Sequence, residues 1–166
     1  LRCLVGSEMC IRDRYDISPA GLKLEITESA VIMDVPKQAA LIEKLQAEGF
    51  VVEMDDFGSG YSSLNTLKDI PVDILKLDMK FMEKSKNTKR SADIVQMVVA
   101  MADKLGMPVI AEGVETKEQA DFLGRIGCDI IQGYYYAKPM SMEEFEQLLN
   151  KYPYRDIVQK GIGNDI

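Results

Sequence analysis

The sequence predicts an α/β protein with a (β/α)8 barrel of the TIM type, present as an incomplete barrel with about the last five βα units. Short runs of strand-forming residues alternate with helical segments along the chain, which is typical of a parallel sheet with helices outside it. Charged or amide side chains follow directly where these runs end. A whole barrel needs about 250 residues, so a chain of 166 residues is expected to lack the first three strands.

Composition and charge exclude several classes of protein. Hydrophobic residues make up 46% of the chain and charged residues 28%, which is ordinary for a soluble globular domain. The net charge of -7 argues against polymeric nucleic acid as a partner, so a phosphate-bearing ligand would need a mediating cation. The absence of histidine excludes histidine-based zinc sites and Ser-His-Asp triads.

Cysteine usage and hydropathy favour a cytoplasmic chain. The three cysteines form no CxxC pair, which favours a reducing compartment over a disulfide scaffold. No apolar run reaches the length of about 18 residues that a membrane helix needs, and no signal peptide opens the chain. We therefore expect a cytoplasmic domain, in a parent protein that missing N-terminal segments could tether to a membrane.

Regular elements begin after the first residues of the chain. Residues 1–14 show no clear periodicity and have no assigned role, whereas 22–27 alternate as a strand does. Asp34 is the expected N-cap of a helix that Gly49 ends. A strand over 50–55 follows and leads into a glycine-rich loop.

Periodicity and capping residues predict the rest of the chain. The elements expected there are a short helix over 64–68, a strand over 72–77, a helix over 91–105, a strand over 108–111, a helix after Thr116, a strand over 128–131 and a helix to about Lys151. Thr116 with Gln119, and Ser141 with Glu144, are expected to form capping boxes. We place the domain at residues 15–152 and a frayed tail at 153–166.

Two adjacent aspartates, Asp55 and Asp56, end the second strand, although neither is a good strand residue. Such a pair can also cap a helix. Neighbouring strand residues point to opposite faces, however, so one aspartate can reach one metal ion while the other turns to a second. Two metal ions about 3.5–4 Å apart can clamp a phosphoryl group and make hydroxide from water. The position therefore favours metal binding over a cap.

Other strand ends carry further candidate side chains. Glu25 is either a solvated strand end or a ligand. Lys76, inside an apolar run, is either a snorkelling side chain at a sheet edge or a fixed cation near the reacting water or phosphate. Glu112 is either a solvated loop acid or a group that takes a proton from metal-bound water. Gln132 is expected to form hydrogen bonds, and the tyrosines 134–136 either stack on a ligand ring or pack the rim.

Taken together, these residues resemble the C-terminal part of the EAL domain family, the cyclic di-GMP phosphodiesterases. The resemblance covers roughly residues 15–150, and five motifs stand in the family's order and at family-like spacing. They are Leu24-Glu25-Ile26-Thr27-Glu28-Ser29, Asp55-Asp56-Phe57-Gly58-Ser59-Gly60-Tyr61-Ser62-Ser63-Leu64, Leu75-Lys76-Leu77-Asp78, Ala111-Glu112-Gly113-Val114-Glu115 and Gln132-Gly133-Tyr134.

The resemblance implies a barrel enzyme that opens cyclic di-GMP to pGpG with two Mg2+ or Mn2+ ions. The implied roles are metal ligand for Glu25, Asp55 and Asp56, orientation of the nucleophilic water for Lys76, general base or holder of metal-bound water for Glu112, support of the site for Gln132, and stabilisation of the loop beside the metals for Glu28 and Glu115. It also implies a homodimer in the full-length protein, with sensor or diguanylate cyclase domains upstream.

Two family ligands are not found in the sequence. The glutamate of the Glu-Ala-Leu signature and an asparagine would both precede residue 1, and residues 1–14 do not resemble the family's helix at this point. We therefore expect a truncated reading frame with an artefactual leader, inactive by itself because ligands are missing and a sheet edge is open. The alternatives are a degenerate EAL domain that senses cyclic di-GMP or mediates protein contacts, and an enolase-like barrel enzyme, which the Asp55-Asp56 pair with its glycine loop disfavours.

Overall fold

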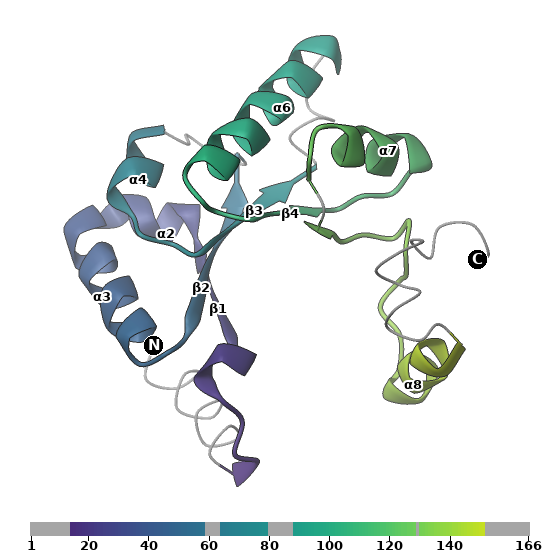
Figure 1. Cartoon of the computed structure of the whole chain (residues 1–166), viewed down its shortest axis with the longest axis horizontal. Coiled ribbons are helices and arrows are strands. Elements are labelled where there is room, and N and C mark those ends of the chain that lie inside the picture. The colour runs from purple at the N-terminus through teal and green to yellow at the C-terminus, as the bar shows by residue number, and fades with distance from the viewer. Residues whose placement is uncertain (1–13, 59–63, 80–87, 129, 152–166) are drawn as a thin grey trace.

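The computed structural model describes residues 14–58, 64–79, 88–128 and 130–151. Helices and strands alternate along these segments, as Figure 1 shows. The strands are β1 (Lys23–Thr27), β2 (Val51–Phe57), β3 (Ile74–Asp78), β4 (Val109–Glu112) and β5 (Ile130–Ile131). The helices are the 3-10 turn η1 (Pro19–Gly21), α2 (Glu28–Met33), α3 (Val35–Ala47), α4 (Leu64–Asp69), α6 (Thr88–Lys104), α7 (Lys117–Arg125) and α8 (Met142–Lys151).

The strands form one parallel sheet in the order β1-β2-β3-β4-β5. In Figure 1, α2, α3, α4, α6 and α7 lie along one side of this sheet, and α8 lies away from it. Sequential parallel strands with helices on the outer side are the arrangement of a (β/α)8 barrel. The predicted fold class, an incomplete barrel of five βα units, is therefore confirmed for the described residues.

The strand register gives the sheet two faces of different chemistry, because successive side chains of a strand point to opposite sides. The helix face carries Leu24, Ile26, Val52, Met54, Leu75, Leu77, Val109 and Ala111. The opposite face, which we call the lumen face, carries Lys23, Glu25, Glu53, Asp55, Ile74, Lys76, Asp78, Ile110 and Glu112. The apolar face holds the fold together, and the charged face is where a barrel has its interior.

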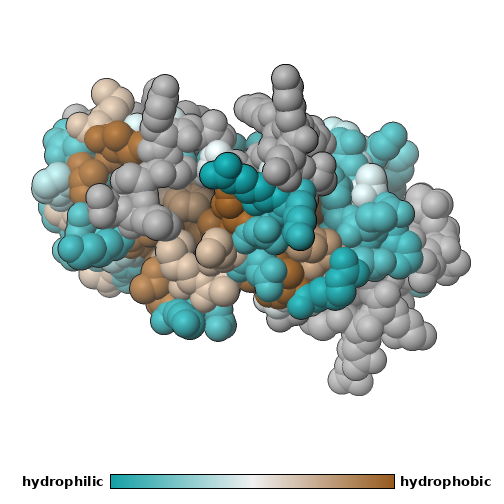
Figure 2. Space-filling view, turned by 90° about the horizontal axis from the view of Figure 1, so that it is seen from above, coloured by the Kyte–Doolittle hydropathy of each residue, from teal (hydrophilic) through white to brown (hydrophobic). Residues whose placement is uncertain are grey.

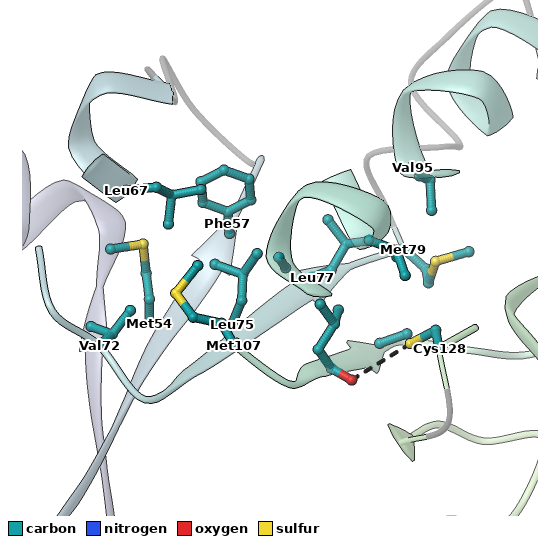
Figure 3. Packing of buried hydrophobic residues seen from close by; sticks show 14 of the residues in the cluster. Met54, Phe57, Leu67, Val72, Leu75, Leu77, Met79, Val95, Met107 and Cys128 are labelled. Atoms are coloured by element: carbon teal, nitrogen blue, oxygen red, sulfur yellow. Dashed lines mark hydrogen bonds between the residues drawn. The ribbon is translucent and has the colours of Figure 1, made fainter. Parts of the chain in front are cut away.

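The hydrophobic core lies between the helix face and the helices (Figure 3). Leu75 and Leu77 from the central strand are 0% and 2% exposed, and Val95 of α6 packs into the same cluster. Burying a side chain of this size stabilises the fold by about 1.5–3 kcal/mol. Cys128 belongs to the cluster, and its thiol donates a 3.6 Å hydrogen bond to the carbonyl oxygen of Val109.

Seen from above, the side on which α6 lies, the surface is a mixture of hydrophilic and hydrophobic residues (Figure 2). Exposed large apolar side chains include Met33 and Met97, in α2 and α6. None of the described helices is long and apolar enough to cross a membrane.

Most of the predicted elements are confirmed, together with their caps. Asp34 accepts a 3.3 Å hydrogen bond from the backbone of Lys37 and begins α3. Thr116 and Gln119 form the predicted capping box of α7. The second predicted box is present too, and its two hydrogen bonds between Ser141 and Glu144 are 2.8 and 3.3 Å long.

Several element bounds differ from the sequence-based expectation. Strand β2 continues through both aspartates to Phe57, α6 begins at Thr88 rather than at 91, and β5 is Ile130–Ile131 rather than 128–131. Helix α2 was not expected, but the Thr27 side chain accepts a 3.4 Å hydrogen bond from Ala30 and caps it. Strand β3 starts at Ile74 rather than at 72, and the carboxylate of the preceding Asp73 accepts the backbone N–H of Val52 at 2.7 Å.

The predicted ends of the chain fall almost wholly outside the described residues. This holds for the leader at 1–14, apart from Arg14, and for the tail at 153–166. The domain boundaries at 15 and 152 therefore stay predictions.

Candidate active site

Acids from three strands surround one lysine on the lumen face. Lys76, in the middle of β3, is 6% exposed. Its Nζ lies 2.5 Å from Glu25 Oε1, 3.1 Å from Asp55 Oδ1 and 3.1 Å from Glu112 Oε1. We call these three acids the carboxylate cluster. They come together because parallel strands bring their carboxyl ends to the same edge of the sheet.

The central position of β3 decides between the two interpretations of Lys76. Its strand has neighbours on both sides, so the side chain does not snorkel from a sheet edge. Burial acts to lower the pKa of Lys76, but the favourable interactions of its ammonium with Glu25, Asp55 and Glu112 outweigh this effect and raise the pKa above the usual lysine value. Lys76 is therefore a fixed positive charge at neutral pH.

Glu112, at the end of β4, is a partly buried acid of the carboxylate cluster. Burial raises the pKa of its carboxyl group above the usual value, and the hydrogen bond with Lys76 offsets part of this effect. A carboxylate with a raised pKa is a better proton acceptor near neutral pH than an ordinary one. This direction is the one that the predicted role of Glu112 as a proton acceptor requires, and the role itself stays a prediction.

The two adjacent aspartates lie in a distorted end of β2. The register between β2 and β3 shifts between Met54 and Phe57, and Asp56 has a φ of 57°, a left-handed conformation that residues other than glycine rarely adopt. Bulges of this kind re-aim side chains near functional sites. Asp55 points to Lys76 on the lumen face, whereas Asp56 is exposed. The two aspartates thus differ in environment, and the prediction that each of them reaches a different metal ion stays a prediction.

The other predicted site residues are not among the ion-pair partners that the described structure shows for Lys76. They are Gln132, Glu28 and Glu115. Gln132 is exposed and follows β5, and its backbone carbonyl accepts from Val114 at 3.2 Å. Glu28 is 3% exposed at the start of α2. Glu115 is exposed, and its backbone N–H donates to Gln119 at 2.8 Å. The loop that Glu28 and Glu115 were expected to stabilise includes 59–63, which lie outside the described residues.

The tyrosines after β5 adopt two different environments. The rings of Tyr135 and Tyr136 meet edge to face, with centroids 5.0 Å apart, and both side chains pack against the hydrophobic core. Tyr134 is 57% exposed, and the Lys138 ammonium lies 6.0 Å from its ring centre. Tyr135 and Tyr136 therefore pack the rim, whereas the side chain of Tyr134 is exposed.

One buried acid on the lumen face was missed from the sequence. Glu53 is 4% exposed, lies beside Glu25 in the register of β1 and β2, and forms a 2.9 Å ion pair with Lys23. The available signal was its spacing, because a residue two positions before Asp55 on a strand shares its face.

The donor chemistry of the site fits a divalent cation. Mg2+ and Mn2+ prefer oxygen ligands, which carboxylates supply. Oδ1 of Asp55 is buried and has no well-directed hydrogen bond in the described structure, although it lies 3.1 Å from Lys76 Nζ. Among the same residues no group of three or more acids has the geometry of a ready metal site, and the carboxylate cluster surrounds the Lys76 ammonium instead. Metal binding by Glu25, Asp55 and Asp56 therefore stays a prediction.

A pocket elsewhere in the described residues has different chemistry. It has a volume of about 340 Å3 and is lined by residues that include Asp103, Met107, Val109 and Ile130. Asp103 is near the end of α6, and Met107, Val109 and Ile130 lie at the amino-terminal ends of β4 and β5. The pocket is therefore at the opposite end of the strands from the carboxylate cluster, which is the candidate active site.

The sequence model of one protein family, the EAL domain, matches residues 7–139. The chain belongs to the EAL domain family. Among curated relatives of this EAL domain, it is 38% identical over 144 residues to the cyclic di-GMP phosphodiesterase NbdA of Pseudomonas aeruginosa, covering 84% of this chain and 18% of NbdA. It is 37% identical over 144 residues to the cyclic di-GMP phosphodiesterase RocR of the same organism, covering 87% of this chain and 37% of RocR. The EAL domain described here thus spans well under half the length of these relatives.

Solved structures of the family agree with the fold. The PaMucR phosphodiesterase in a c-di-GMP complex matches with a TM-score of 0.76 and 39% identity, over 86% of this chain and 57% of that one. BlrP1 of Klebsiella pneumoniae, as a manganese/cy-diGMP complex, matches with a TM-score of 0.73 and 31% identity, over 81% of this chain and 34% of that one. Both likenesses extend to the sequence as well as the fold.

Proposed function

We propose that the whole protein is a cyclic di-GMP phosphodiesterase that hydrolyses its substrate to pGpG with two Mg2+ or Mn2+ ions. The observation that carries the proposal is the carboxylate cluster around Lys76, at the strand ends of an EAL domain. Relatives named as cyclic di-GMP phosphodiesterases, and a structural neighbour solved with manganese, support it. A metal-dependent reaction also suits a chain of net charge -7, since its substrate carries phosphates.

Each member of the site has a proposed part in this reaction. Glu25, Asp55 and Asp56 hold the metal ions, which when bound supply positive charge to the phosphoryl oxygens and acidify water. Lys76, a fixed cation, orients the attacking water by donating to its oxygen. Glu112 accepts the proton of that water at a carboxylate oxygen, for which its raised pKa suits it.

Three other residues are proposed to support the site. Gln132, at the end of β5, donates a hydrogen bond toward the substrate side of the sheet. Glu28 and Glu115 stabilise the loop that follows Asp56, and this loop couples the site to a partner subunit of a homodimer. The support for Glu28 is its burial at the start of α2, beside the strand that carries Glu25.

The proposal extends to location and domain organisation. We infer that the EAL domain is cytoplasmic and that sensor or diguanylate cyclase domains precede it. Cys128 is a buried thiol that is not part of a disulfide, which suits a reducing compartment. One relative, 40% identical over 131 residues, is named a bifunctional diguanylate cyclase/cyclic di-GMP phosphodiesterase, MucR.

We propose further that the 166 residues alone do not turn over substrate. In the described sheet, β1 and β5 each have one neighbouring strand, so the lumen face is open at both edges. Water that enters an open site screens the charges on which metal binding and phosphoryl transfer depend.

Hydrolysis with Mn2+ tests these proposals. The 166-residue chain, and the chain within a protein that supplies the remaining barrel strands, are incubated with cyclic di-GMP, and pGpG is measured by liquid chromatography. We expect pGpG from the longer protein only, and a loss of about 100-fold or more in Asp55→Asn. The control Asp103→Asn changes an exposed acid of α6 and is expected to keep full activity.

The same assay separates the alternative function. A degenerate EAL domain that senses cyclic di-GMP would bind it without producing pGpG in the longer protein. The retained carboxylate cluster speaks against this outcome. Substantial turnover by the 166 residues alone would contradict the inferred inactivity.

A further inference from the structure

We propose that Lys76 is a positioning residue that assembles the carboxylate cluster ahead of the divalent cation and then gives up its contacts with Glu25 and Asp55 to that cation. This inference rests on the proposed function, because it concerns the same metal site. It adds a role for Lys76 in the protein without metal or substrate. There the ammonium neutralises the carboxylates that the metal ion binds later.

The charge balance of the cluster supports this role. Three carboxylates converge on the Lys76 ammonium. Among the described residues, each of these acids has its ion pair with Lys76. At short range and partly shielded from water, three like charges repel one another strongly unless a cation lies between them. Lys76 supplies that cation from within the chain, so the three carboxylate groups can lie close together.

The contacts also show which partners can be exchanged. Glu25 contacts Lys76 with Oε1 and is half exposed, so solvent and ions can reach it. Asp55 offers Oδ1 at 3.1 Å, and this buried oxygen lacks a well-directed hydrogen bond, so its attraction to the ammonium is mainly Coulombic. A divalent ion attracts the same oxygens with twice the charge. The lysine can then keep its contact with Glu112.

A second lysine on the lumen face provides a matched comparison. Lys23 forms a 2.9 Å ion pair with the buried Glu53, which is the partner of Glu25 in the register of β1 and β2. It carries the same charge on the same face, but its described ion pair is with an acid outside the carboxylate cluster. The variant Lys23→Met is therefore the control for removing a positive charge from the lumen face without changing the carboxylate cluster.

The experiment compares thermal unfolding midpoints and Mn2+ affinities of the whole protein with Lys76→Met and with Lys23→Met. Methionine keeps the apolar stem and removes the charge. With EDTA, both variants are expected to unfold at lower temperature than the unmodified protein. Mn2+ is expected to raise the midpoint of Lys76→Met by more than that of the unmodified protein and to bind it about tenfold more tightly by calorimetry. For Lys23→Met we expect the same Mn2+ shift as for the unmodified protein.

The outcomes separate this inference from the proposed function. Equal or smaller Mn2+ shifts in Lys76→Met than in the unmodified protein would overturn the exchange and leave the proposed hydrolysis standing. No Mn2+ effect on any of the proteins would overturn both. If Lys76→Met does not fold, Lys76→Arg decides, because a guanidinium holds two carboxylate oxygens at once and should weaken Mn2+ binding several-fold. Unchanged or tighter binding in Lys76→Arg would contradict the exchange.

Discussion

Replacing Gly133 with alanine is expected to destabilise the domain by about 2–4 kcal/mol, through overpacking and lost hydrogen bonds. Gly133 lies in the loop after β5, against the loop that follows β4. A Cβ at Gly133 would lie 2.0 Å from the carbonyl oxygen of Val114 and 2.4 Å from its nitrogen. Real Cβ atoms essentially never approach within 3.0 Å of another group, so one of the two loops must move.

The structure sets the size of this effect. Val114 is 0% exposed, so its backbone cannot shift outward without disturbing the core. Its N–H donates to Gln132 at 3.2 Å and its carbonyl accepts from Tyr135 at 3.0 Å. Losing these two hydrogen bonds costs about 1–3 kcal/mol, and residual crowding adds about 1 kcal/mol or more. Because the loops carry Glu112 and Gln132 on their flanks, the proposed hydrolysis should weaken too.

Urea unfolding followed by circular dichroism measures this prediction, with Gly124→Ala as the control. Gly124 lies in α7, and a Cβ there meets nothing within 4 Å. The control should therefore stabilise the domain by about 0.5–1 kcal/mol, because alanine favours a helix. The same chemical change is thus expected to have opposite signs at the two sites. A Gly133→Ala protein as stable as the unmodified one would refute the close approach of the two loops.

Two further predictions concern Asp56 and Thr116. Asp56→Gly should stabilise the fold by about 0.5–1 kcal/mol in the same urea assay, since glycine accepts the φ of 57° without strain, while it should weaken Mn2+ binding by calorimetry. Equal Mn2+ affinity would exclude Asp56 as a ligand. Thr116→Ala should cost about 1 kcal/mol in urea unfolding, because it removes the 3.3 Å cap on the Gln119 backbone. The conservative Thr116→Ser keeps the hydroxyl group and should cost little.

The face assignment of the acids follows from the sequence. Alternation along a strand places Glu25 and Lys76 on one side, and the parallel βα repeat places them at the same edge of the sheet. Both the shared face and the shared edge follow from the residue pattern alone. The register that puts Asp55 beside Lys76 depends instead on hydrogen bonding between β2 and β3, which local sequence does not specify.

Other features depend on tertiary packing that periodicity does not report. The bulge at the end of β2 sets the left-handed conformation of Asp56. Helix α2 has six residues and follows β1 directly, and its N-cap Thr27 is also the last residue of that strand. The alternating strand pattern therefore hides the cap. The close approach at Gly133 arises between loops from different βα units. In each case the decisive partner is distant in sequence or the local signal is too short.

The different chemistry of the two sheet faces has a consequence for how this domain tolerates change. The helix face is apolar and packs into the core, so its substitutions act on stability through lost burial. The lumen face gathers the carboxylate cluster with Lys76 and the Glu53 pair with Lys23, and apolar side chains of similar size can often replace buried ion pairs without loss of stability. The Lys23–Glu53 pair lies outside the carboxylate cluster, and replacing it by methionine and leucine together changes no net charge. The double replacement is therefore expected to keep the unfolding free energy within about 1 kcal/mol and to leave the Mn2+ affinity unchanged, as in Lys23→Met. A changed Mn2+ affinity would show that cation binding on the lumen face extends beyond the carboxylate cluster to Glu53, the register neighbour of Glu25.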